Sequence, residues 1–482
     1  MTNEEIIRIA EQGQADLMSD MLEDLIEGHR AHRGAKAREL YERYKQENLP
    51  IQTRLTRNPN KIDERIPNDY FADIIDTKTG YMGNEVHVEL QKERFLDEAG
   101  STVPEYDEIG ALIEDFSTLN NSEDQNSEAV KLASIAGECF RIIYIPEGRN
   151  EIRSMLIPAH EGIMIEDESL NETQYFIRYY YVSDHEYDTV TGKSQVTRRT
   201  VVEWYDHEMI TYYIDDGRGH YVQDVSKFGG EQPHLFDGVP VVAFRNNSES
   251  QGEAEKVIDL IDAYDTVLSA TVSEIEQLRL AYLKYRGGQA VDNDLLQLME
   301  QTGILPLDAD GDASFVTKEL AIDAVKVMLD ELRKNIYQFS RGIDLSKDYG
   351  GNIRVIGWQV ALLNLENSCK VTERKFVRGL REQWRMIAEK WREWGMADLN
   401  YLDMRFVFTR NFPKDLAGEA KILLDLLGSV SRKTAYSQMS FIDDADSEIA
   451  AWEMEREMNM SLFGIDSGGD DGEPEDTTDE DE

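Results

Sequence analysis

The chain has 482 residues, 41% of them hydrophobic and 9% aromatic, so it can bury the cores of two or three ordinary domains. Its 51 basic and 95 acidic residues give a formal net charge of −44, which repels nucleic acid and anionic membranes from most of the surface. This charge indicates either a halophile-like acidic surface or a protein that touches DNA without holding it. The polar N-terminus and the lack of a long apolar run argue against a signal peptide and a membrane-spanning helix.

The first third of the chain reads as helices separated by polar and proline-rich breaks. Apolar residues at helical spacing predict helices over 15–47, 68–83 and 105–135. Asn68 is a suitable N-cap, and Pro50, Pro59 and Pro67 make the preceding stretch a loop. The third helix is interrupted at "NNSEDQNS". Cys139 and Cys369 lie in apolar runs, which predicts buried thiols in a reducing compartment and no disulfide.

From residue 138 to 225 the apolar period changes from that of a helix to that of a strand. The segments "CFRIIYI", "QYFIRYYYVSD", "RRTVVEWYD" and "MITYYIDD" alternate apolar and polar residues, and turn signals such as "DDGRG" separate them. We therefore expect an antiparallel meander, followed by one more strand in "GVPVVAFRNN". The overall fold class expected is α+β and predominantly helical.

A long amphipathic helix is predicted from about Gly252 to Leu283. One side carries an apolar stripe: Val257, Leu260, Ile261, Tyr264, Val267, Leu268, Val272, Ile275 and Leu278. The opposite side carries Asp259, Asp262, Ser269, Ser273 and Glu276. Beyond an irregular stretch come a helix over 320–340, a glycine-rich loop, a very long helix over 358–394, the strand "MRFVFTRNF" and short helices over 414–461. The tail 466–482 holds ten acids and no base, which predicts disorder.

Motifs for catalysis or metal binding are incomplete in this sequence. "YDTVTGKS" ends like a phosphate-binding loop, but Tyr187 stands where that motif needs glycine. "DADGDASFVTKE" has the acids of a calcium loop, yet Ala313 replaces its turn glycine, so an acidic hairpin tip is favoured. The weak candidate ligands there are Asp308, Asp310, Asp312 and Glu319. His29 and His32 of "HRAHR" lack a third ligand. The sequence thus predicts no enzyme and no cofactor.

Taken in order, these segments resemble the portal proteins of tailed bacteriophages of Gram-positive hosts. The resemblance spans roughly residues 50–460. It is carried by "RIPNDYFADIIDTKTGYMGN", "GVPVVAFRNNSESQGEAEKVIDLIDAYDTVLSATVSEIEQL", "NLENSCKVTERKFVRGLREQWRMIAEKW" and "MRFVFTRNFPKD". "VIDLIDAYDTVLS" is the most specific stretch, and the meander is much less specific.

The resemblance implies a portal fold with wing, stem, clip and crown, in a closed ring of twelve subunits around a DNA channel. Carried onto this chain, its parts are a wing at 1–252, a first stem helix at 253–281, a clip at 282–318, a second stem helix at 319–341, a tunnel loop at 342–357, a long wing helix with a return strand at 358–412, a crown at 413–465 and an acidic tail at 466–482.

The resemblance also assigns residues to these parts. The channel face of the stem is expected to carry Asp259, Asp262 and Glu276, so that DNA phosphates slide past. The tunnel loop offers Arg341, Lys347 and Arg354 beside Gly350 and Gly351; these cations either touch phosphates transiently or pair with acids such as Asp344 and Asp348. The clip offers Tyr282, Tyr285, Leu295, Leu296 and Leu298, either to partner proteins or to neighbouring clips.

The partners and location follow from the same resemblance. They are other copies of the chain, double-stranded DNA bound without sequence specificity, the terminase large subunit, a head-completion (adaptor) protein, and the major capsid and scaffolding proteins, with no membrane. The ring is expected at one vertex of the capsid in the virion, after assembly in the host bacterial cytoplasm, as a channel for genome packaging and ejection.

Two readings from other classes compete with a portal. A scaffold or tail-assembly protein would account for the long helices, but not for the meander. A metal-dependent phage hydrolase would need two or three carboxylates that converge on Mg²⁺.

Overall fold

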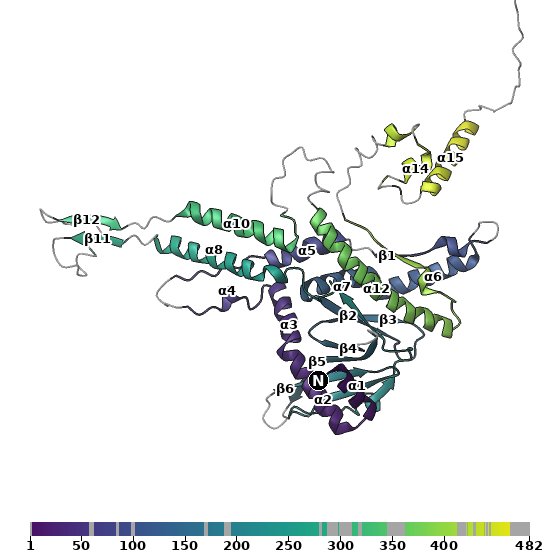
Figure 1. Cartoon of the computed structure of the whole chain (residues 1–482), viewed down its shortest axis with the longest axis horizontal. Helices are drawn as coiled ribbons and strands as arrows, with labels where there is room; N and C mark the ends of the chain where they lie inside the picture. Colours follow the sequence, from purple (N-terminus) through teal and green to yellow (C-terminus); the bar gives the residue numbers. More distant parts are fainter. Residues whose placement is uncertain are drawn as a thin grey trace, which may run out of the picture. The chain divides into compact units, whose positions relative to one another are not determined.

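The structure is a computed structural model of the whole chain. It describes residues 2–56, 62–82, 86–97, 102–167, 172–187, 194–278, 282–286, 297, 311–316, 321–344, 362–411, 421, 423–427, 430–437, 439, 442 and 445–462. Two compact units are present, residues 1–411 and residues 412–482, and each is described by itself. Helices and antiparallel sheets both occur (Figure 1), which is the mixed composition that the sequence predicts.

The N-terminal helices break where the sequence predicts one continuous helix. The chain forms α1 (Asn3–Gln12), α2 (Ala15–Ala31) and α3 (Arg33–Tyr44), with a short α4 (Pro50–Thr53). His32, between α2 and α3, has φ −121° and ψ −90°, outside the helical region. Thr2 caps α1 in a reciprocal pair of hydrogen bonds with Glu5. Met21, Leu22 and Ile26 of α2 are fully buried against a six-stranded sheet, which is described next.

The predicted meander forms the larger of the sheets. Its strands are β4 (Gly162–Glu166), β5 (Thr173–Tyr187), β6 (Ser194–Tyr205), β7 (Met209–Asp215) and β8 (Tyr221–Gln223), in that order, with β9 (Glu231–Pro233) paired to β7. All its pairings are antiparallel. A short 3₁₀ helix η2 (Phe228–Gly230) precedes β9.

The first and last predicted strands do not extend this meander but meet each other in a second sheet. β2 (Glu138–Tyr144) lies between β10 (Val241–Arg245) and β3 (Arg153–Pro158). The prediction of one meander from 138 onward was therefore wrong at its start. Six of the seven residues of β2 are buried, since both faces of this sheet are covered. Phe140 meets Phe176 of the larger sheet with ring centroids 5.1 Å apart.

A long helix, α12 (Leu363–Glu393), covers the other face of the small sheet (Figure 1). The Phe376 ring lies 4.7 Å from that of Phe244 on β10. Buried Arg141 of β2 donates to Gln383 of α12 at 2.8 Å and to Asn126 at 3.0 Å. These partners are needed because a buried guanidinium without hydrogen bonds would be strongly destabilising.

Three further helices surround α12 and the sheet. They are α5 (Tyr70–Met82), α6 (Pro104–Asn120) and α7 (Ser122–Ala136). The predicted interruption between the last two is confirmed at Asn121, which adopts a left-handed conformation with φ 48°. The predicted return strand is β13 (Met404–Phe408), which pairs with β1 (Val86–Leu90). Short 3₁₀ turns η1 (Lys92–Phe95) and η4 (Tyr401–Asp403) flank these strands.

A pair of helices projects from this body (Figure 1). After the turn η3 (Glu255–Val257), α8 (Ile258–Leu278) runs out and α10 (Ile322–Ser340) returns beside it. Between them β11 (Tyr282–Arg286) and β12 (Asp312–Val316) form an antiparallel ribbon. None of the described helices is long and apolar enough to cross a membrane.

The second unit contains α14 (Arg432–Tyr436) and α15 (Ala445–Leu462). Trp452 of α15 joins them: the Arg432 guanidinium lies 3.8 Å from the centre of its ring. Such cation–π contacts are worth about 0.5–1 kcal/mol at exposed sites. The predicted acidic tail lies outside the described residues.

Gly137, which ends α7, should tolerate no side chain. Its φ is +89°, and an added Cβ would lie 2.0 Å from the carbonyl oxygen of Ser250. Gly148 makes a matched control, because its φ is +73° and nothing lies within 4 Å of its Cβ position. Both alanine variants suffer the ordinary cost of a positive φ, about 1–2 kcal/mol. We expect Gly137→Ala to lower the thermal unfolding midpoint well beyond Gly148→Ala; equal midpoints would contradict this close approach.

Candidate functional site

The loop that leads into α8 ends in a buried polar junction. The Lys78 ammonium, from α5, is fully buried and donates to Asn246 Oδ1 at 2.7 Å, Glu253 Oε2 at 2.5 Å and Thr372 Oγ1 at 2.8 Å. Ser368 of α12 donates to the other carboxylate oxygen of Glu253 at 2.6 Å. These bonds tie together three segments that are far apart in sequence: α5, the loop before α8, and α12.

The charges in this junction stabilise each other. Burial alone would raise the pKa of Glu253, but the Lys78 charge and the hydrogen bonds from Lys78, Ser368 and Asn246 outweigh it and lower that pKa. A buried ion pair with all its partners in place is specific, and removing one partner leaves an uncompensated charge. The junction therefore fixes the point from which α8 projects.

Apolar packing surrounds the base of the helix pair. Val257 and Ile261 are buried with Ile74 and Ile75 of α5 and with Ile336 of α10. Tyr70 meets Tyr264 of α8 and Tyr337 of α10 edge-on, at centroid distances of 5.0 and 5.9 Å. The predicted apolar stripe is thus buried at its start. Farther out it is not: Ile275 is 43% exposed.

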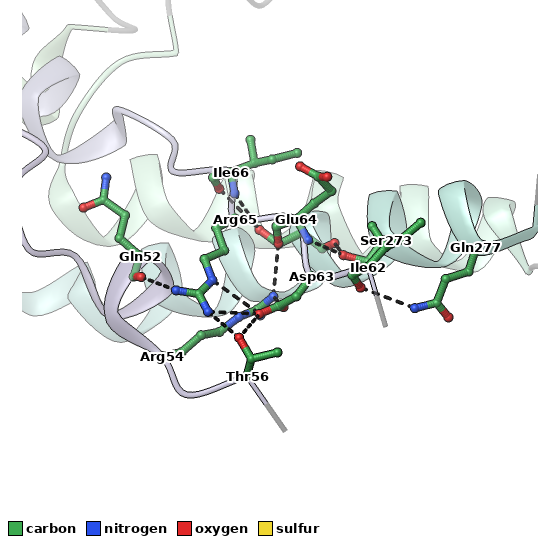
Figure 2. A network of polar contacts seen from close by, with 11 residues as sticks. Gln52, Arg54, Thr56, Ile62, Asp63, Glu64, Arg65, Ile66, Ser273 and Gln277 are labelled. Atoms are coloured by element: carbon green, nitrogen blue, oxygen red, sulfur yellow. Dashed lines mark hydrogen bonds and ion pairs between the residues drawn. The ribbon is translucent and has the colours of Figure 1, made fainter. Parts of the chain in front are cut away.

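The polar side of α8 is covered by residues 62–68, here named the strap (Figure 2). Four side chains of α8, each four residues from the next, bond to it: Asp265, Ser269, Ser273 and Gln277. The backbone amides of Asn68, Ile66 and Glu64 donate to the first three at 3.0, 3.0 and 2.9 Å, and Gln277 donates to the carbonyl of Ile62 at 3.3 Å.

These regularly spaced bonds, here called the ladder, form because the repeat distance of the helix matches that of the extended strap. Four residues of helix rise about 6 Å, and two residues of extended chain span about 6.6 Å. Every second strap residue therefore meets every fourth residue of α8. Pro67 falls at an odd position of the strap, so its missing N–H removes no bond. Ser269 and Ser273, which the sequence places on the polar side of the helix with the expected channel-face acids, are both buried beneath the strap.

An arginine cluster holds the start of the strap (Figure 2). Arg65 donates to the carbonyl of Gln52 at 2.5 Å and to Asp63 Oδ2 at 3.2 Å. Arg54 pairs with Asp63 and donates to the carbonyl of Glu64 at 3.0 Å. Thr56 also donates to Asp63, at 3.2 Å. The strap is thus anchored to α4 as well as to α8.

The three acids expected on the channel face have different surroundings. Asp259 is exposed and Glu276 is half-buried. Asp262 instead accepts two hydrogen bonds from Arg43 of α3, at 2.8 and 3.0 Å, so its charge is matched within the chain. Burial would lower the pKa of Arg43, but the bonds and charges of Asp262 and Glu39 raise it overall.

The tunnel-loop candidates fall mostly outside the described residues. Arg341 ends α10 in a left-handed conformation with φ 61°, and Gly342 follows it. Asp344 pairs with Arg333 of α10 at 2.7 Å. Lys347, Gly350, Gly351 and Arg354 are not described, so their contact with DNA or with acids stays a prediction.

The clip and calcium candidates are described only in part. Tyr282 and Tyr285 belong to β11, whose backbone alone is described, and Asp312 begins β12. The remaining predicted residues lie outside the described part: Leu295, Leu296, Leu298, Asp308, Asp310 and Glu319.

His29 and His32 are the histidines that the sequence offers as metal ligands. His29 is buried, and its Nδ1 lies 2.7 Å from the hydroxyl of Tyr179, so it packs in the core. Burial is the main cause that lowers its pKa to about 4. Among the described residues, Asp20, Glu23 and His220 lie near enough to share an ion. Sequence spacing could not reveal this group, since 197 positions separate Glu23 from His220.

Loss of the serine ladder should loosen the strap. In Ser269→Ala/Ser273→Ala the amides of Ile66 and Glu64 lose their acceptors, each worth about 1 kcal/mol. We expect hydrogen exchange of the peptide over residues 62–68 to accelerate, by about fivefold per kcal/mol lost. Thr266→Ala is the control, because its exposed hydroxyl bonds only within α8. Unchanged exchange in the double variant would argue against the ladder.

Asp265 should make stability depend on pH. Burial is the main cause that raises its pKa to about 6, against about 3.9 in an unfolded chain. The folded state then binds more protons between these values, so the contribution of Asp265 falls as pH rises from 4 to 6. We expect Asp265→Asn to gain stability relative to wild type over that interval in chemical denaturation, with Asp259→Asn as control for the lost charge. A constant difference between Asp265→Asn and wild type would refute the shift.

Known proteins share this sequence over most of its length. Residues 23–462 match the family model of the phage portal protein, SPP1 Gp6-like. The portal protein of Bacillus phage SPP1 is 25% identical over 432 residues, which cover 83% of this chain and 82% of that protein. The portal protein of Clostridium phage phiCD119 is 23% identical over 306 residues, which cover 61% of this chain and 64% of that protein. The resemblance inferred from the sequence is confirmed, and the chain belongs to the SPP1 Gp6-like family of phage portal proteins.

Proposed function

We propose that copies of this chain close into a ring, with α8 and α10 as the stem around a channel for double-stranded DNA. The observation that carries the proposal is the set of large apolar side chains left exposed on the helix pair: Ile275, Ile322, Val327, Met328 and Phe339. Val327 is 68% exposed and Phe339 55%. Five large apolar side chains exposed on two adjacent helices are more than scattered single groups, and they indicate an interaction surface. A heterologous contact whose rotation closes makes a ring.

The charge of the chain supports a channel that does not hold DNA. A surface that gathers phosphates releases counterions and becomes adhesive, whereas a chain of net charge −44 repels them. Exposed Asp259 and half-buried Glu276 are the described acids of α8 that suit the channel face. Asp262 is a poorer candidate, since Arg43 already matches its charge.

The remaining parts extend this proposal. The ribbon of β11 and β12 belongs to a clip over 282–318, which would contact the terminase large subunit and later a head-completion protein. Residues 342–357 would form the tunnel loop, with Lys347 and Arg354 touching phosphates briefly. Residues 413–465 would form the crown. The ring, with twelve subunits expected, would occupy one capsid vertex, bound by capsid and scaffolding proteins, for packaging and ejection of DNA.

Ring assembly should depend on the apolar face of α10. Val327→Asp/Met328→Asp places two charges in the proposed contact, so we expect a shift from rings toward monomers in mass photometry and negative-stain images. Val225→Asp is the control, because Val225 is 71% exposed in the turn after β8. A wild-type chain that stays monomeric across protein and salt concentrations would contradict the ring. Undiminished rings in the double variant would place the contact elsewhere.

A further inference from the structure

One edge of β10 is unpaired within the part of the chain that the structure describes. Among the described residues the strand pairs with β2 alone. Ile143 donates to the carbonyl of Pro240, and Asn246 donates to the carbonyl of Gly137, both at 2.9 Å. Bonded and non-bonded positions alternate in an antiparallel pair, so the N–H and C=O of Ala243 point away from β2. An open edge is a template for a further strand.

A cleft of about 610 Å³ lies along this edge. Val241, Val242, Ala243 and Arg245 of β10 form its floor. One wall comes from the larger sheet, with Met164, Glu166 and Thr173; the other comes from α12, with Lys375, Arg378, Glu382 and Arg385. The cleft is thus a slot bounded by a sheet and a helix, with main-chain groups between them.

The wall from α12 carries two cations, Lys375 and Arg378, that form no ion pair with any described residue. Residues 370–385 hold six basic and two acidic residues, in a chain with nearly twice as many acids as bases. Lys370 and Arg385 pair with neighbouring glutamates. Within the described part of the chain, Arg374, Lys375, Arg378 and Arg381 form no ion pair. Helical spacing places them away from Phe376, which faces the core.

We infer that this cleft receives an extended acidic segment of a second copy, which adds as a strand to β10 and sets carboxylates against Lys375 and Arg378. The inference rests on the proposed ring, which brings a second copy beside each cleft. Main-chain pairing gives affinity in such strand addition, and flanking side chains give specificity. A neighbour with net charge −44 supplies acids in excess. DNA fits less well, because it carries no main-chain N–H and C=O groups that could pair with the edge of β10.

The edge and the cations can be tested separately. Ala243→Pro removes an N–H that serves no bond to β2, and proline is tolerated at such edge positions. Lys375→Glu/Arg378→Glu reverses the charge of the wall. We expect each variant to need at least about tenfold more protein than wild type for half-maximal assembly in mass photometry. Arg8→Glu, at an exposed position of α1, is the control. If the proline variant has a lowered unfolding midpoint, its weaker assembly could come from misfolding, and the charge-reversal variant then provides the test.

Carbodiimide cross-linking of mixed ¹⁴N- and ¹⁵N-labelled wild-type rings identifies the occupant. The expected product joins Lys375 to an aspartate or glutamate of the other isotope. This inference would be overturned if the cross-links join residues of one copy only. It would also be overturned if the variants assemble as readily as the wild type. Either result would leave the proposal of a ring standing. Protection of Lys375 by added duplex DNA, without inter-copy products, would assign the cleft to DNA and overturn it as well. A wild-type chain that never assembles would overturn both proposals.

Discussion

The position of the helix pair depends on one buried charge. Lys78 of α5 is enclosed by Glu253 and Asn246 of the loop before α8 and by Thr372 of α12. Because an unpaired ammonium in an apolar interior is strongly unfavourable, all three partners must be present together. Two close approaches support the junction: Gly137 and Gly252 let residues 250–252 lie directly on the end of α7. The buried lysine and the two glycine contacts therefore all fix the point at which α8 leaves the body.

The strap extends that control along the helix. Its bonds to Asp265, Ser269, Ser273 and Gln277 occupy the polar side of α8, while Val257 and Ile261 occupy the apolar side. What remains uncovered on α8 is a narrower surface than its sequence pattern suggests. Any contact with a neighbour or with DNA must use that surface, which includes Asp259 and Ile275.

Local periodicity predicted the elements, and long-range pairing decided how they meet. The alternation in β5, β6 and β7 and the apolar stripes of α8 and α12 were visible in the sequence, since each is set by neighbours a few residues away. That β2 pairs with β10 across about a hundred residues was not visible. Nor was the strap: serines on a helix usually face water, and only the backbone of residues 62–68 makes Ser269 and Ser273 interior groups. The family resemblance predicted the parts of the chain, but it could not predict which acids of α8 form an ion pair with a base of the same chain.

The distribution of cations shows how an acidic chain can still associate with itself. Many of the bases are used inside the fold: Lys78 with Glu253, Arg43 with Asp262, and Arg410 with Glu366 and Glu373. The surface that remains is rich in acids, and two such surfaces repel each other over about 8–10 Å at physiological salt. Association must then come from short-range contacts that outweigh this repulsion. In the proposed ring, the apolar groups on α10 would provide one such contact. The cations of α12 that pair with no described residue would provide another, which salt weakens where it strengthens the apolar contact. A ring held by both would keep its geometry over a wider range of ionic strength than either contact alone could support.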